Sequence, residues 1–171
     1  MLSYFVAPLR RTVEALVSSD SPRQLAAGFT LGMVVGLMPK GNLIAISLCV
    51  LIFSLRINRG LALVAVVLFS CLGAAMDPFA HKVGLAVLNY APMQACYASL
   101  FNMPLGPWLG FHNTVVMGAF CIGVYVSYPT YWATRKSSER LQPRLRALVR
   151  RYRIARLVFD VDTETEQRQA A

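Results

Sequence analysis

Acidic residues are scarce in this chain of 171 residues, which holds eight Asp and Glu against seventeen Lys and Arg. The resulting net charge of +9 is unevenly spread, because ten of the basic residues follow Tyr131 and four of the acids lie within residues 160–166. An evenly basic surface would indicate nucleic acid as a partner. Basic residues that flank apolar segments indicate instead the cytoplasmic face of a membrane, so no nucleic-acid binding is expected.

Catalytic and metal-binding motifs are also missing. Nothing resembles a nucleophile with its base, a phosphate-binding loop or a dinucleotide fingerprint. We therefore expect no enzyme activity, no metal and no cofactor. The N-terminus places apolar residues before basic ones, the reverse of a cleavable signal peptide. The cysteines are far apart, without a CxxC pair, which argues against a zinc site or a structural disulfide and favours small buried hydrophobes: Cys49, Cys71, Cys96 and Cys121.

Apolar residues, by contrast, are abundant. They make up 56% of the chain, and the mean hydropathy is +0.51, whereas a soluble domain contains about 45–50% apolar residues. The length allows one compact domain of a few helices. We therefore predict an all-α integral membrane protein whose membrane domain covers residues 21–134.

The membrane domain is predicted to begin with a helical hairpin over residues 22–55. Its arms, residues 22–38 and 43–55, would reach roughly 25 Å and 20 Å as helices, which is short against a hydrocarbon core of about 30 Å. The hairpin is therefore expected to be either re-entrant or tightly packed. A glycine recurs at every fourth position of the first arm, which opens one face to close packing by a second helix: Gly28, Gly32 and Gly36.

Two further membrane helices are predicted, over about residues 60–76 and 113–132. At the Asp77–Pro78 step, either one helix breaks or a span ends and a surface helix begins, since proline removes a backbone donor. Residues 89–110 are predicted to form a loop with a short helix near residues 93–101. Aromatic residues flank the last span at both ends, as at membrane interfaces: Trp108, Tyr128, Tyr131 and Trp132.

Amphipathic helices are predicted at both ends of the chain. Residues 1–20 carry apolar side chains at helical spacing, which fits a helix lying in the interface or packed on the membrane domain. Residues 135–171 are predicted to form a basic cytoplasmic helix followed by an acidic, disordered tail. The arginines of this helix either bind anionic lipid head groups, at roughly 1 kcal/mol each, or only determine topology: Arg144, Arg146, Arg150, Arg151 and Arg153.

The basic residues also predict an orientation. If the hairpin starts and ends on one side of the membrane and the two further helices each cross once, fifteen of the seventeen Lys and Arg share that side. Only Lys40 and Lys82 lie elsewhere. The positive-inside rule then makes both termini of a multi-pass protein cytoplasmic.

Several short motifs resemble a known family. The chain is similar to the bacterial membrane family catalogued as domain of unknown function 2062 in three places: Ser21-x-x-Gln-Leu-Ala-x-Gly-Phe29, Gly36-Leu-Met-Pro39 and Asn58. Residues 76–81 and 111–118, which read MDPFAH and FHNTVVMG, resemble a short branch of that family. The resemblance covers about residues 19–125 and implies a protein of the bacterial inner membrane without an established activity.

Two pairs of polar residues are candidates for a ligand or ion site. Lys40 and Asn42 occupy the hairpin tip, residues 39–42, where they either attract an anion or a lipid phosphate or form a solvated turn. Asp77 and His81 are four residues apart and either share a helical face as an ion site or serve as a helix cap and an interfacial residue. Asp77 is the only carboxylate of the membrane domain that could pair with Lys40.

Two functions fit this sequence. The first is a non-catalytic accessory or scaffold component of the membrane, in contact with anionic lipids and with a membrane-protein partner or a second copy of the chain. The second is a carrier or lipid-handling protein with an anion or lipid-phosphate site at the hairpin tip, since short helices with polar tips build transport sites.

Overall fold

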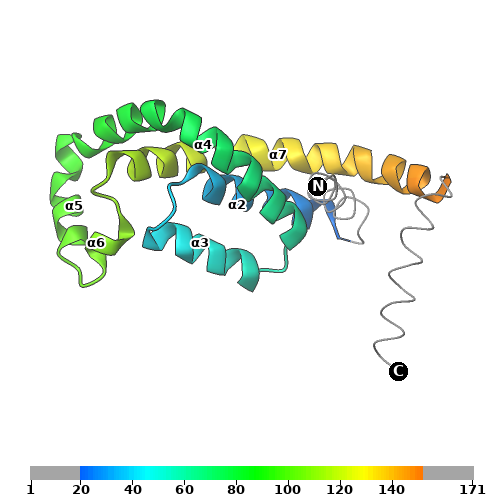
Figure 1. The fold of residues 1–171 in the computed structure, drawn as a ribbon, viewed down its shortest axis with the longest axis horizontal. Coiled ribbons are helices and arrows are strands. Elements are labelled where there is room, and N and C mark those ends of the chain that lie inside the picture. The colour runs from blue at the N-terminus through cyan, green and yellow to red at the C-terminus, as the bar shows by residue number, and fades with distance from the viewer. Residues whose placement is uncertain (1–19, 152–171) are drawn as a thin grey trace, which may run out of the picture.

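The computed structural model describes residues 20–151, with side chains as far as Arg144, and this part of the chain contains helices and no strand (Figure 1). The all-α prediction is confirmed for these residues. The predicted helix over residues 1–20 and the acidic tail lie outside them. The elements, in chain order, are α2 (Pro22–Leu37), α3 (Leu43–Ser54), α4 (Arg59–Leu88), the 3-10 turn η1 (Ala91–Met93), α5 (Gln94–Phe101), α6 (Gly106–Leu109) and α7 (Thr114–Arg151).

Helices α2, α4 and α7 form the body of the fold (Figure 1). The first hairpin arm, α2, packs chiefly on α4 and α7 and much less on the second arm, α3. Helix α3 keeps Ile46, Val50 and Phe53 exposed on its outer side. The two arms therefore do not form a tightly packed pair, because α2 buries its surface against the two long helices.

The three glycines of α2 lie against α4. A Cβ atom on Gly28 would lie 2.5 Å from the backbone oxygen of Asn58, and one on Gly36 would lie 2.7 Å from the Cβ of Phe69. A Cβ on Gly32 would overlap the backbone oxygen of Ala62. The expected close approach of a second helix is present, but the glycine row lines the α2–α4 interface and not the inside of a hairpin.

A second close approach joins α4 to α7. A Cβ on Gly84 would overlap the backbone oxygen of Thr114, and one on Gly118 would overlap the backbone oxygen of Ala80. The two helices therefore meet backbone to backbone where α7 begins, as small residues allow in membrane bundles.

Helix α4 continues through Asp77 and Pro78, so neither of the two predicted breaks occurs. A proline inside a helix removes one hydrogen bond and crowds the preceding turn, but α4 is held on both sides of this position. Gly73 lies against Leu37 of α2, and Gly84 lies against α7. Helix α4 is curved in Figure 1, and such bending relieves the crowding around a proline inside a helix.

The predicted last span and the predicted basic helix are one helix, α7, which contains Pro129 and Pro143. A helix boundary near residue 134 is therefore wrong. Arg144 is exposed near the end of the described side chains. Three of the other arginines expected to contact lipid belong to α7, namely Arg146, Arg150 and Arg151. Arg153 lies outside the described residues.

A polar layer joins the starts of α2 and α4 to the C-terminal third of α7. The side chain of Asn58 caps α4, accepting a bond of 2.7 Å from the amide of Leu61, and donates a bond of 2.6 Å to the carboxylate of Asp20. Gln142 of α7 donates a bond of 3.0 Å to the backbone oxygen of Asp20. This polar layer fixes all three helices at the end of the bundle opposite the hairpin tip.

Within residues 20–151, two helices are long and apolar enough to cross a membrane, namely α4 and residues 114–144 of α7. Both leave large apolar side chains exposed along their length, among them Leu63, Val67, Leu68, Leu72, Phe79, Val124 and Trp132. A soluble monomer seldom exposes contiguous apolar surface on this scale.

Candidate functional site

The hairpin tip is a tight turn whose lysine folds back on the preceding helix. Gly41 has φ of 96°, a left-handed conformation that favours glycine. The ammonium group of Lys40 donates three hydrogen bonds to backbone oxygens at the end of α2, at distances of 2.7 Å to Val35, 3.0 Å to Gly36 and 2.9 Å to Met38. These oxygens would otherwise lack partners, because a helix leaves its last four carbonyls unpaired. Lys40 is therefore a cap for α2 as well as a charge at the tip.

Asn42 completes the turn and starts the second arm. Its side-chain oxygen accepts a bond of 2.8 Å from the amide of Ala45, and its side-chain nitrogen donates a bond of 2.6 Å to the backbone oxygen of Pro39. Asn42 is buried, so both of its polar ends need these partners. The residue is a structural cap for α3.

The tip faces the loop between α6 and α7, and the two enclose a cleft of about 420 Å³. We call it the tip cleft. Gly110, at φ of 77°, lets this loop approach the tip so closely that a Cβ atom there would lie 3.1 Å from the Cβ of Asn42. The tip cleft is lined by Pro39, Lys40, Gly41 and Asn42 on one side and by Pro107, Trp108, Gly110, His112, Asn113 and Val116 on the other.

Two helices begin at the tip cleft. Asn113 accepts bonds of 2.9 Å and 3.4 Å from the amides of Val115 and Val116 at the start of α7, and Asn42 caps α3. Helix starts carry a partial positive charge, and the Lys40 ammonium adds a full one. Among the described residues no carboxylate forms an ion pair with Lys40. The tip cleft is therefore electropositive and suited to an anion.

Asp77 and His81 do not join this site. The Nδ1 atom of His81 lies 2.6 Å from the hydroxyl of Thr114, so His81 links α4 to the start of α7. Asp77 is exposed, and it caps no helix because α4 runs through it. Asp77, the one carboxylate of the membrane domain that could pair with Lys40, forms no ion pair with it. The carbonyls at the end of α2 are only two to five residues from Lys40, and they take its three N–H donors first.

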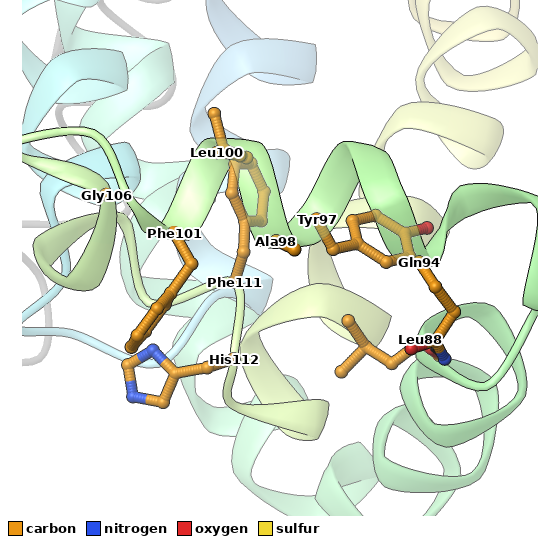
Figure 2. Close-up of a pocket in the computed structure, with 9 residues that line it drawn as sticks. All are labelled: Leu88, Gln94, Tyr97, Ala98, Leu100, Phe101, Gly106, Phe111 and His112. Atoms are coloured by element: carbon orange, nitrogen blue, oxygen red, sulfur yellow. Dashed lines mark hydrogen bonds between the residues drawn. The ribbon is translucent and has the colours of Figure 1, made fainter.

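A second cavity, of about 340 Å³, adjoins the tip cleft (Figure 2). We call it the apolar pocket. It lies between α5 and the loop before α7, and His112 lines both cavities. His112 meets Phe101 edge to face, with ring centres 5.8 Å apart. The apolar pocket is lined by Leu88, Gln94, Tyr97, Ala98, Leu100, Phe101, Gly106, Phe111 and His112.

Sequence reasoning did not predict the side of the tip cleft that the loop before α7 forms. The sequence predicts Trp108 only as an interfacial aromatic residue and contains His112 and Asn113 only as part of a family motif. Residues 83–134 contain no Asp, Glu, Lys or Arg, and that charge-free run is the signal that could have marked an apolar site. Across residues 20–151, no group of three or more His, Cys, Asp and Glu is arranged to hold a metal ion.

These features define a small helical protein whose described part has two helices long and apolar enough to cross a membrane and an electropositive cleft at one end of the bundle. The chain belongs to the family described as "Uncharacterized protein conserved in bacteria (DUF2062)", whose model matches residues 9–146. The resemblance inferred from the short motifs is thereby confirmed.

One uncharacterised protein matches most of this chain. The chain is similar to an uncharacterised protein of Treponema pallidum (strain Nichols), with 29% identity over 121 residues that cover 71% of this chain and 75% of that protein. No solved structure matches the chain.

Proposed function

We propose that this is a multi-pass protein of the bacterial inner membrane with both termini in the cytoplasm. The stretch of α7 from Thr114 to Thr134 has no charged residue, and its length of about 31 Å matches a hydrocarbon core of about 30 Å. The polar layer of Asp20, Asn58 and Gln142 then lies toward the cytoplasm. Most of the basic residues lie on that side, as the positive-inside rule requires.

In this topology the hairpin tip lies near the opposite membrane boundary. Met38 and Ile44, on the two sides of the tip, pack with Ala80 and Val116. Val116 is two residues from the start of α7, which is about 3 Å along the helix axis. Lys40 is thus expected at the level of lipid head groups and not at the middle of the bilayer.

The molecular role we propose is lipid handling without catalysis, with the phosphate of an anionic lipid bound in the tip cleft. The observation that supports this proposal is the position of Lys40, which lines the cleft and forms no ion pair with a carboxylate among the described residues. Its hydrogen bonds go to neutral carbonyls, which orient the ammonium but do not cancel its charge. A phosphate would neutralise that charge, and the start of α7 would add favourable dipoles.

A scaffold or accessory role is the second candidate, and a different observation favours it. Tyr125 and Tyr128 of α7 are 84% and 79% exposed within the stretch proposed to cross the membrane. A hydroxyl group facing lipid lacks a hydrogen-bond partner, which is costly in hydrocarbon. A second copy of the chain or another membrane protein could cover this face of α7.

The two roles are separated by lipid binding to the purified protein. Native mass spectrometry in a neutral detergent, with phosphatidylglycerol or phosphatidylcholine added, counts the lipids that stay bound. We expect preference for phosphatidylglycerol in the parent, a loss of about tenfold in that preference in Lys40→Met, and partial retention in Lys40→Arg.

Lys82→Met is the matched control, because Lys82 is an exposed lysine of α4 that does not line the tip cleft. It should behave like the parent. If Lys40→Met keeps the parental preference while remaining folded, the tip is a capped turn and the scaffold role stands in place of lipid handling.

A further inference from the structure

We propose that the ligand is a single anionic amphiphile whose phosphate occupies the tip cleft while its hydrocarbon chain lies in the apolar pocket. The inference rests on the proposed lipid-handling function and adds a second half to its site. Both cavities, of about 420 Å³ and 340 Å³, fall in the volume range of small-ligand pockets, about 300–1,000 Å³.

The two cavities are neighbours along one loop. Gly106 lines the apolar pocket, Pro107 and Trp108 line the tip cleft, and His112 lines both. Figure 2 shows His112 beside Phe101 at one end of the apolar pocket, with Leu88 and Gln94 at the other end. The two cavities therefore meet at His112, and in the proposed complex the ligand passes this side chain from the tip cleft into the apolar pocket.

Two polar side chains of the apolar pocket, Gln94 and Tyr97, already donate hydrogen bonds within the protein. Gln94 donates a bond of 3.0 Å to the backbone oxygen of Leu88, and the hydroxyl of Tyr97 donates a bond of 3.4 Å to that of Val87. Both bonds satisfy carbonyls at the end of α4. What the pocket offers a ligand is the side chains of Ala98, Leu100 and Phe111. Such a surface suits a hydrocarbon chain, because a polar ligand would lose its hydration without new hydrogen bonds.

The surroundings favour a lipid over a water-soluble anion. The segment that builds the apolar pocket has no charged side chain between Lys82 and Arg135. The same segment exposes further large apolar residues that line neither cavity, including Met93, Met103 and Leu105. A chain of the surrounding bilayer would meet an apolar surface on its way into the pocket, and an inorganic anion would find partners only at the tip cleft.

The test uses the two tryptophans of the chain. Trp108 borders the tip cleft and is 73% exposed, whereas Trp132 lies far along α7. A Trp132→Phe background isolates Trp108, and its emission is titrated in micelles of a steroid-based detergent, which has no free alkyl chain. The probes are dodecyl phosphate and butyl phosphate, which share a head group and differ in chain length.

Ala98→Phe fills the apolar pocket, and Ala95→Phe makes the same change on α5 outside it. We expect the parent to bind dodecyl phosphate at least about tenfold more tightly than butyl phosphate. Ala98→Phe should bring that ratio close to one without changing butyl phosphate binding, and Ala98→Leu should have an intermediate effect. Ala95→Phe should keep the parental ratio.

If Ala98→Phe keeps the parental ratio, the chain does not enter the apolar pocket and this inference is overturned. The proposed function survives that result as long as Lys40→Met still weakens binding of both probes. If neither probe changes the emission of Trp108, or if Lys40→Met binds both as the parent does, the lipid-phosphate site itself is wrong and the inference falls with it.

Discussion

Replacing Gly32 by alanine tests the packing on which the bundle depends, because two effects oppose each other in sign. On an open helix face, Gly→Ala stabilises by about 1 kcal/mol through helix propensity. At Gly32, however, the new Cβ would overlap the backbone oxygen of Ala62 and would lie 2.9 Å from the Cβ of Ala65. Both neighbours are fully buried on α4. Neither can rotate away, so α2 and α4 must move apart.

The magnitude follows from that separation. Overpacking a well-packed site costs about 1–3 kcal/mol, and backbone obstacles place Gly32 at the upper end. After the gain in propensity, a net loss of about 2 kcal/mol remains, which lowers the melting temperature by about 4–8 °C in a chain of this size. Leu25 and Met33, which are 0% and 2% exposed, would lose part of their burial as the helices separate.

The assay is thermal unfolding of the detergent-solubilised protein, followed by intrinsic fluorescence. Ala75→Leu, an enlargement at an exposed position of α4, is the control and should change the melting temperature by little. Gly32→Leu should be more destabilising than Gly32→Ala. A Gly32→Ala protein that melts above the parent would refute the packing of α2 on α4.

Three further predictions concern the cap of α4, the hairpin tip and the orientation in the membrane. Asn58→Ala removes the α4 cap and the bond to Asp20, so it should cost about 2 kcal/mol, whereas Asn102→Ala, at an exposed residue, should be nearly neutral in the same unfolding assay. Lys40→Met should impair complementation of a deletion phenotype more than it lowers protein abundance, and normal complementation would remove the tip from the functional account. A reporter fused after Ala171 should be active only in the cytoplasm, and activity outside it would reverse the proposed orientation.

The sequence predicts helix boundaries well where neighbouring residues set them. The predicted hairpin arms, residues 22–38 and 43–55, match α2 and α3 to within one residue, and the caps Ser21 and Asn42 set where the two helices start. The short helix predicted near residues 93–101 is α5, and the helix predicted to begin at about residue 60 begins at Arg59. In each case the side chain or turn that sets the boundary lies within a few residues of it.

The errors arose where packing at a distance outweighs a local rule. Pro78 suggested a break, but contacts of Gly73 and Gly84 with other helices hold α4 continuous. The glycine row of α2 was assigned to a hairpin because its neighbour in sequence is α3, whereas its neighbour in space is α4. Sequence spacing identifies a face for packing and cannot identify its partner.

The sequence predicts only one side of the tip cleft, because the other side comes from a segment distant in the chain. Lys40 and Asn42 stand out as polar residues between two apolar arms. The other side of the tip cleft includes Trp108 and His112. These residues lie near the hairpin tip only because α4 continues past Pro78 and the chain then returns along α7. Asp77 seemed the natural partner of Lys40 by charge, but backbone carbonyls at the end of α2 lie closer along the chain.

The side of the membrane on which the tip cleft lies is tested most directly by cysteine labelling. In a background without the four native cysteines, Trp108→Cys reports on the tip cleft and Ser137→Cys on the opposite end of α7; both positions are exposed. A membrane-impermeant maleimide applied to spheroplasts should modify Trp108→Cys at once and Ser137→Cys only after permeabilisation. Labelling of both positions from the same side, or of Ser137→Cys alone in intact spheroplasts, would contradict the proposed arrangement.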